Sequence, residues 1–141
     1  MSSTPYESAT LLIRLYELRR DPAMREARAW YVSQFHPDTV DDVVAALRGP
    51  NSAQFRMVTS YWDMAASFVN NGAIDEQMFA DANGEHVIVF AKLEPFLAEY
   101  RERMGNPNYY GSLEKLVMKA PGMKQRLAAI RDRFKPRPAA T

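Results

Sequence analysis

The sequence predicts an all-α fold, a single-domain irregular bundle of about seven or eight helices. Three observations lead to this prediction: apolar residues recur at spacings of three and four, helix-start motifs precede these stretches, and glycines or prolines follow them. With 141 residues, 47% of them hydrophobic and 25% charged, the chain has the size and composition of one globular domain. We expect one helical domain over residues 1–134 and a disordered basic tail over residues 135–141.

Three helices are predicted before residue 50. The first begins at the capping-box motif Thr4-Pro5-Tyr6-Glu7 and runs to about residue 20. Asp21-Pro22 repeats the start signal and opens a second helix over residues 22–35. A third helix, capped by Asp38 or Thr39, ends at Gly49-Pro50.

The clearest helix lies in residues 51–72. Its apolar residues fall on one face: Phe55, Val58, Tyr61, Trp62, Ala65, Ala66, Phe68 and Val69. Asn51 or Ser52 can cap its start, and Gly72 can adopt the left-handed conformation that ends a helix. Because so aromatic a face has to be covered by other helices, we expect this helix to form the centre of the bundle.

Four helical segments are predicted after residue 72. The first spans about residues 74–82, and the last two span residues 112–119 and 123–134. Between them, residues 85–104 contain Val87-Ile88-Val89-Phe90, which has the composition of a strand. The longer apolar pattern keeps helical spacing, so we predict a helix that is kinked near Pro95.

Charge is distributed unevenly along the chain. Residues 1–114 carry 10 Lys and Arg against 16 Asp and Glu, whereas residues 115–141 carry 8 against 1. We call five of these C-terminal cations the basic arm: Lys119, Lys124, Arg126, Arg131 and Arg133. The arm could bind nucleic-acid phosphates or an anionic surface. We favour its docking on the acidic remainder of the chain or on a second copy, because basic residues commonly end helices and aromatic stacking residues are scarce around it.

Three arginines beside aromatic residues are candidates for binding an anion or an acidic partner. Arg25 and Arg28 share a predicted helix with Trp30 and Tyr31, and Arg101 follows Tyr100. Guanidinium groups in such settings bind carboxylates and phosphates through paired hydrogen bonds and stacking. The favoured alternative is that they form salt bridges with nearby residues such as Glu26, Glu99 or Glu102.

The sequence offers few groups for catalysis or metal binding. It has no cysteine and only two histidines, which excludes disulfides and thiolate zinc sites and leaves few ligands for any other metal. We expect His86 to be a partly buried, hydrogen-bonded side chain. Asp63 lies with Ser60 and Asn70 on the polar face of the central helix, and we expect that face to be solvated rather than to line a cleft. We therefore predict no catalytic residues, no metal site and no cofactor.

Several segments resemble a known family. They are Asp21-Pro22-Ala23-Met24-Arg25-Glu26-Ala27-Arg28, the helix ending in Asn71-Gly72-Ala73-Ile74-Asp75, Pro95-Phe96 with Glu99-Tyr100-Arg101, and Tyr109-Tyr110 with Leu113-Glu114-Lys115-Leu116. Together they are similar to an uncharacterised, mainly bacterial, all-helical family that is described as a domain of unknown function. The resemblance covers most of residues 21–120. It implies a helical domain and no assigned activity.

The function we predict is a non-catalytic protein-interaction or regulatory module that binds a protein partner or a second copy of itself. The eight methionines and many aromatic residues suit either an adaptable core or a protein-binding surface. Nucleic-acid or anionic-surface binding through the basic arm is the first alternative, and a small-molecule or metal-dependent enzyme is the second. No stretch reaches the roughly 18–20 apolar residues of a membrane span, and we expect a cytoplasmic protein.

Overall fold

The computed structural model describes residues 2–136, and this part of the chain is helical without any strand. The first half contains α1 (Pro5–Arg19), α2 (Pro22–Ser33), α3 (Val40–Arg48) and α4 (Ser52–Asn70). The second half contains α5 (Glu76–Ala82), α6 (Glu85–Leu93), the 3₁₀ turn η1 (Glu94–Phe96), α7 (Leu97–Met104), α8 (Gly111–Val117) and α9 (Met123–Phe134). The predicted all-α fold is therefore confirmed. The tail prediction lies outside the described residues from residue 137 onward.

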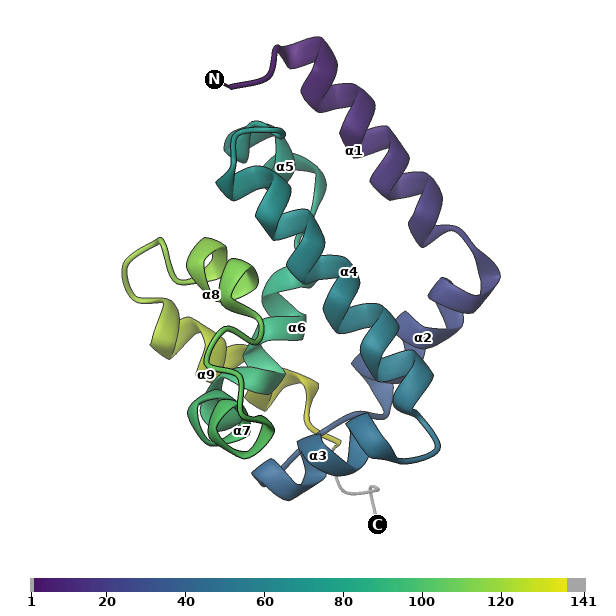
Figure 1. The fold of residues 1–141 in the computed structure, drawn as a ribbon, viewed down its shortest axis with the longest axis vertical. Helices are drawn as coiled ribbons and strands as arrows, with labels where there is room; N and C mark the ends of the chain where they lie inside the picture. The colour runs from purple at the N-terminus through teal and green to yellow at the C-terminus, as the bar shows by residue number, and fades with distance from the viewer. Residues whose placement is uncertain (1, 137–141) are drawn as a thin grey trace.

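Helix α4 is the centre of the bundle, as predicted. It packs chiefly against α2 and α8, and α6 packs against α9. Figure 1 shows α4 running through the molecule, with α2 on one side and α8 on the other. The largest side chains of the core come from several helices and include Trp62, Phe55, Tyr31, Phe90 and Tyr100. Gly72 ends the α4 segment with a φ of 80°, the left-handed conformation that glycine adopts without strain.

The predicted kink near Pro95 separates α6 from α7. Helix α6 ends at Leu93, a 3₁₀ turn holds Pro95, and α7 begins at Leu97. Proline cannot donate a backbone hydrogen bond, so the turn of helix that contains it has to rearrange. The strand alternative for residues 87–90 is wrong, because all four lie within α6.

Helix starts are predicted from the sequence more accurately than helix ends. Thr4 and Thr39 each form a reciprocal capping box, with Glu7 and Asp42 respectively. Asn51 occupies the N-cap position of α4, but its side chain makes no capping hydrogen bond. Helix α2 stops at Ser33, two residues earlier than predicted.

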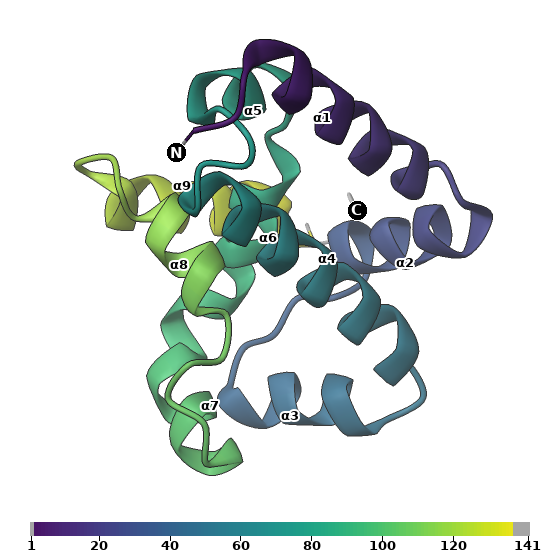
Figure 2. The ribbon, with the colours of Figure 1, turned by 45° about the horizontal axis from the view of Figure 1, so that its top comes forward.

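Helix α1 lies along the edge of the molecule. Figures 1 and 2 show it at the periphery, and its main contacts are with α5 near one end and α2 near the other. Its start is fixed by Ser3, whose backbone N–H donates to the Gly72 carbonyl over 2.9 Å, and by Ser8, whose hydroxyl oxygen accepts from the Asp75 N–H over 3.0 Å. Much of the surface of α1 therefore remains exposed.

Candidate functional site

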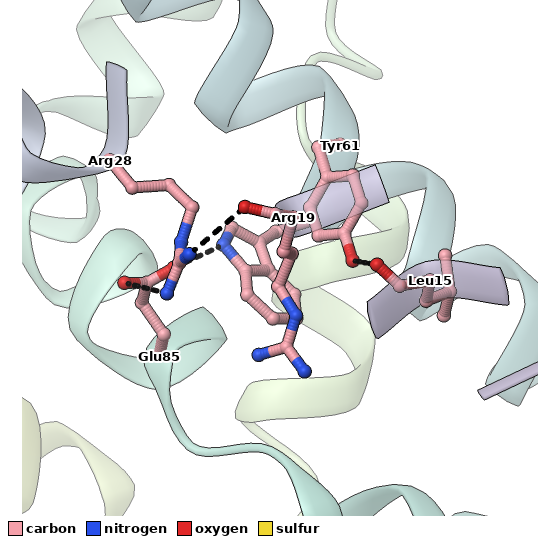
Figure 3. A network of polar contacts seen from close by, with 6 residues as sticks. Leu15, Arg19, Arg28, Tyr61 and Glu85 are labelled. Carbon is pink, nitrogen blue, oxygen red and sulfur yellow. Dashed lines mark hydrogen bonds and ion pairs between the residues drawn. The ribbon is translucent and has the colours of Figure 1, made fainter. Parts of the chain in front are cut away.

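Arg28, one of the three predicted arginines, is held in an internal network. Its Nε donates to Oε2 of Glu85 over 2.8 Å and its Nη2 donates to Oε1 over 3.2 Å, which makes a bidentate ion pair. The same Glu85 accepts a hydrogen bond from Trp62 Nε1 over 3.1 Å, and Arg28 Nη1 donates to the Arg19 carbonyl over 3.5 Å. Figure 3 shows the Arg28 guanidinium facing the Glu85 carboxylate, with dashed lines marking the contacts. Arg28 thus joins α2 to α6, and its acidic partner belongs to its own chain.

Two groups in the same region fasten α1 to the body. The Tyr61 hydroxyl donates to the Leu15 carbonyl over 2.7 Å, and burial raises the pKa of this phenol to about 12, so it remains a donor. The Arg19 guanidinium carbon lies 5.5 Å from the centre of the Trp62 ring. Arg19 was not among the predicted site residues, because nothing in the local sequence links it to Trp62.

Arg101 and Arg25 lie in settings unlike that of Arg28. Arg101 Nη2 donates to Glu114 Oε1 over 3.0 Å, and its Nε donates to the Tyr109 carbonyl over 2.9 Å. It therefore braces the turn that leads into α8. Arg25 is exposed and has no ion-pair partner among residues 2–136. Arg28 and Arg101 each satisfy their own network, so these arginines do not form one anion site.

The basic arm is partly neutralised by the chain itself. Lys119 pairs with Glu76, with its Nζ 3.1 Å from Oε1, and Arg131 donates to the Ala91 carbonyl over 2.8 Å and lies 3.4 Å from a Glu94 oxygen. The exposed remainder of the arm consists of Lys124, Arg126 and Arg133. By helical periodicity Lys124 lies on one flank of the apolar stripe of α9, and Arg126 and Arg133 lie on the other. This division does not produce one continuous basic face.

The polar face of α4 does not face solvent alone, so that expectation is wrong. Asp63 Oδ1 accepts a hydrogen bond from the Leu113 backbone N–H over 2.9 Å, and Asn70 Nδ2 donates to the Ser112 carbonyl over 2.9 Å. The Asp63 carboxylate thereby caps the first turn of α8, where backbone N–H groups lack helical partners. The sequence could not reveal this, because the partners lie 50 and 42 residues away.

The two histidines lie in different surroundings. His86 is buried between Phe79, 5.0 Å away by ring centroids, and Trp62, 5.9 Å away, and its Nδ1 has no hydrogen-bond partner. His86 was expected to be partly buried and hydrogen-bonded; it is buried, but this nitrogen makes no hydrogen bond to the described residues, and burial lowers the pKa of His86 to about 4. His36 Nε2 lies 3.0 Å from the Ser33 carbonyl oxygen. Within residues 2–136 no three His, Asp or Glu side chains are grouped closely enough to hold a metal ion.

The largest exposed apolar side chains gather on α1, a feature that the prediction missed. In the described part of the chain the exposed large hydrophobics are Tyr6, Ile13, Tyr16, Leu18, Met57 and Met64, and the first four belong to α1. Tyr6 is 81% exposed and Ile13 is 59% exposed. The run from Leu11 to Leu18 is apolar around more of the helix than one buried face requires, and this breadth is the signal that could have revealed a second apolar surface.

Comparison with known proteins assigns the chain to a family but supplies no activity. No curated protein and no solved structure matches it. No helix of the described residues is both long enough and apolar enough to cross a membrane. A family model described as a domain of unknown function (DUF4760) matches residues 6–120, which is most of the chain. The resemblance inferred from the helix-start and packing motifs is thereby confirmed, and the chain belongs to the DUF4760 family, a domain of unknown function.

Proposed function

We propose that this protein is a non-catalytic interaction module that self-associates through the outer face of α1. We define the α1 outer face as Tyr6, Ile13, Tyr16 and Arg20. The observation that supports this proposal is the concentration of exposed large apolar side chains on this one helix. Apolar side chains gathered on one exposed surface are typical of protein-binding sites.

The spacing of this face favours a second copy of the chain as the occupant. Tyr6 and Arg20 each lie seven residues from Ile13, so all three fall close to one line along the helix. In an antiparallel pair centred on Ile13, Arg20 of each copy meets Tyr6 of the other. Arg20 already lies over an aromatic ring in its own chain, 5.9 Å from the Tyr16 centroid. Such pairing adds cation–π contacts to the burial of Ile13.

The central residue Ile13 provides a direct test of self-association. We expect the wild-type mass from light scattering to approach that of a dimer as concentration rises. Ile13→Arg places a charge at the centre of the pair and raises the dissociation constant by about a hundredfold or more. Because Ile13 is exposed, the variant retains its fold and its circular dichroism spectrum.

The matched control adds the same charge elsewhere. Ala128 is exposed on α9, so Ala128→Arg leaves dimerisation unchanged. A wild-type chain that remains monomeric up to millimolar concentration contradicts self-association. Equal dimerisation of Ile13→Arg and the wild type contradicts the assignment of the interface to α1.

We also propose that the protein is located in the cytoplasm. The support is the lack of cysteine, since a chain without disulfides needs no oxidising environment to fold. Fluorescence microscopy of the tagged chain in a bacterial host checks this, with diffuse signal expected.

A further inference from the structure

A cleft beside α4 has the size of a small-molecule site. It is an open groove of about 720 Å³ between α3, α4, α7 and the turn before α8, a volume within the range of known ligand pockets. Figure 2 labels the three longer helices that bound it. Polar and aromatic side chains line it, among them Arg56, Asp63, Asn106, Tyr100 and Tyr110. The surface is therefore hollowed and chemically mixed, unlike the α1 outer face.

One wall of this cleft contains a buried donor without an acceptor. Tyr100 is 1% exposed, and its hydroxyl has no hydrogen-bond partner. Burial raises the pKa of this phenol well above its ordinary value, so the group stays protonated and able to donate. The adjacent Tyr110 hydroxyl donates its proton to Thr59 Oγ1 over 3.4 Å, and the proximity of this second phenol raises the pKa of Tyr100 further. An unpaired buried hydroxyl is costly, which makes its position at a cleft informative.

The charges around the cleft favour an anionic group near Tyr100. Arg56 lines the cleft and has no ion-pair partner within residues 2–136. The carboxylate that lines the cleft, Asp63, is engaged with the Leu113 N–H, where the dipole of α8 offsets part of its charge. Among the described residues, Arg56 thus offers the cleft a cation without an ion-pair partner, and Tyr100 offers a donor without an acceptor.

The turn before α8 is held in a strained shape at the same place. Tyr110 has a φ of 58°, the one positive φ at a non-glycine residue among the described residues. Such conformations persist where surrounding contacts enforce them, and they concentrate at ligand sites. Here the bracing comes from Arg101, which binds the Tyr109 carbonyl and Glu114. The aromatic wall of the cleft is therefore fixed before any ligand arrives.

We propose that this cleft binds a small organic carboxylate with an aromatic or aliphatic body. The carboxylate accepts a hydrogen bond from the Tyr100 hydroxyl and pairs with Arg56. The body of the ligand lies against Met57 and the Tyr109 and Tyr110 rings, which line the same cleft. This inference is independent of self-association through α1.

Titration of the ¹⁵N-labelled chain with phenylacetate, followed by NMR, tests the site. We expect saturable shifts of backbone amides around the cleft, including those of Ser60 and Asn106. Benzylamine, which has a similar body and the opposite charge, produces no such shifts. Arg56→Gln and Tyr100→Phe each raise the phenylacetate dissociation constant by about tenfold or more, because each removes a hydrogen bond to a charged group.

Two controls separate binding from folding. Arg14→Gln removes an exposed cation on α1 and leaves the affinity unchanged. Tyr100→Phe removes the unpaired buried hydroxyl, so it raises the melting temperature of the free chain while weakening binding. The proposal is overturned if phenylacetate shifts no cleft amide, if benzylamine binds equally well, or if both cleft variants bind phenylacetate like the wild type. Shifts confined to α1 also overturn it.

Discussion

Lys92 is a charged side chain placed where most lysines are not found. It is 4% exposed, and its Nζ donates to the carbonyls of Tyr31, Val32 and Phe35 over 2.7, 2.9 and 2.7 Å. These carbonyls belong to the end of α2 and the residues after it, where the helix leaves acceptors without internal partners. Burial lowers the pKa of Lys92 to about 8, so the ammonium is still the main form at neutral pH. Lys92 of α6 thereby caps the carbonyl groups at the C-terminal end of α2.

Replacing this lysine tests that role. Lys92→Met keeps the apolar stem but leaves three carbonyls without their donor, and we expect the free energy of unfolding to fall by about 3 kcal/mol. Urea denaturation followed by circular dichroism measures the change. Lys115→Met, at an exposed position of α8, changes stability by less than about 0.5 kcal/mol. An equally small effect at Lys92 would contradict the capping role.

At the scale of the element, α3 shows how much a short motif can determine. Thr39 Oγ1 accepts from the Asp42 N–H over 3.3 Å, and Asp42 Oδ2 accepts from the Thr39 N–H over 3.2 Å. The same carboxylate also accepts from the Asp38 N–H over 2.8 Å. Three backbone donors at the start of one nine-residue helix are thus satisfied by residues within four positions of one another.

Loss of this cap has a measurable cost. We expect Thr39→Ala to lower the free energy of unfolding by about 1 kcal/mol, because Asp42 N–H loses its acceptor. Thr39→Ser retains the hydroxyl and restores most of the stability. Thermal denaturation of the two variants beside the wild type distinguishes them. A serine variant as unstable as the alanine variant would show that the methyl group, rather than the hydroxyl, matters.

The sequence could predict features that depend on neighbouring residues, but not features that depend on contacts between distant ones. Helix starts at Thr4 and Thr39, the central helix and the kink at Pro95 depend on neighbours in the chain, and these predictions were confirmed. The pairing of Arg28 with Glu85 joins residues 57 apart, so no local spacing indicated it. The contact of Asp63 with α8 was missed for the same reason. Which of two apolar faces of α1 is buried likewise depends on packing between helices.

At the scale of the whole molecule, stability should depend on pH through His86. Burial lowers its pKa from 6.5 to about 4, so the folded chain binds this proton less readily than the unfolded chain does. The contribution of neutral His86 to the free energy of unfolding is therefore fully present above pH 6.5 and is lost as pH falls towards 4. A shift of this size corresponds to about 3 kcal/mol.

His86→Phe isolates this contribution. The phenyl ring can occupy the apolar site between Phe79 and Trp62 without a titrating group. We expect the wild type to lose about 3 kcal/mol more stability than the variant between pH 7 and pH 4, as measured by urea denaturation at each pH. Parallel pH profiles for the two chains would contradict the assignment to His86.

The packing of α6 under α9 has a consequence for the nascent chain. Five successive residues of α6, from Val89 to Leu93, are buried, and part of their cover is supplied by a helix that begins only at Met123. During synthesis this segment, apolar except for Lys92, leaves the ribosome before the α9 residues that bury it have been made. It stays open to chaperones, or to neighbouring nascent chains, until residues 123–134 have emerged to close over it.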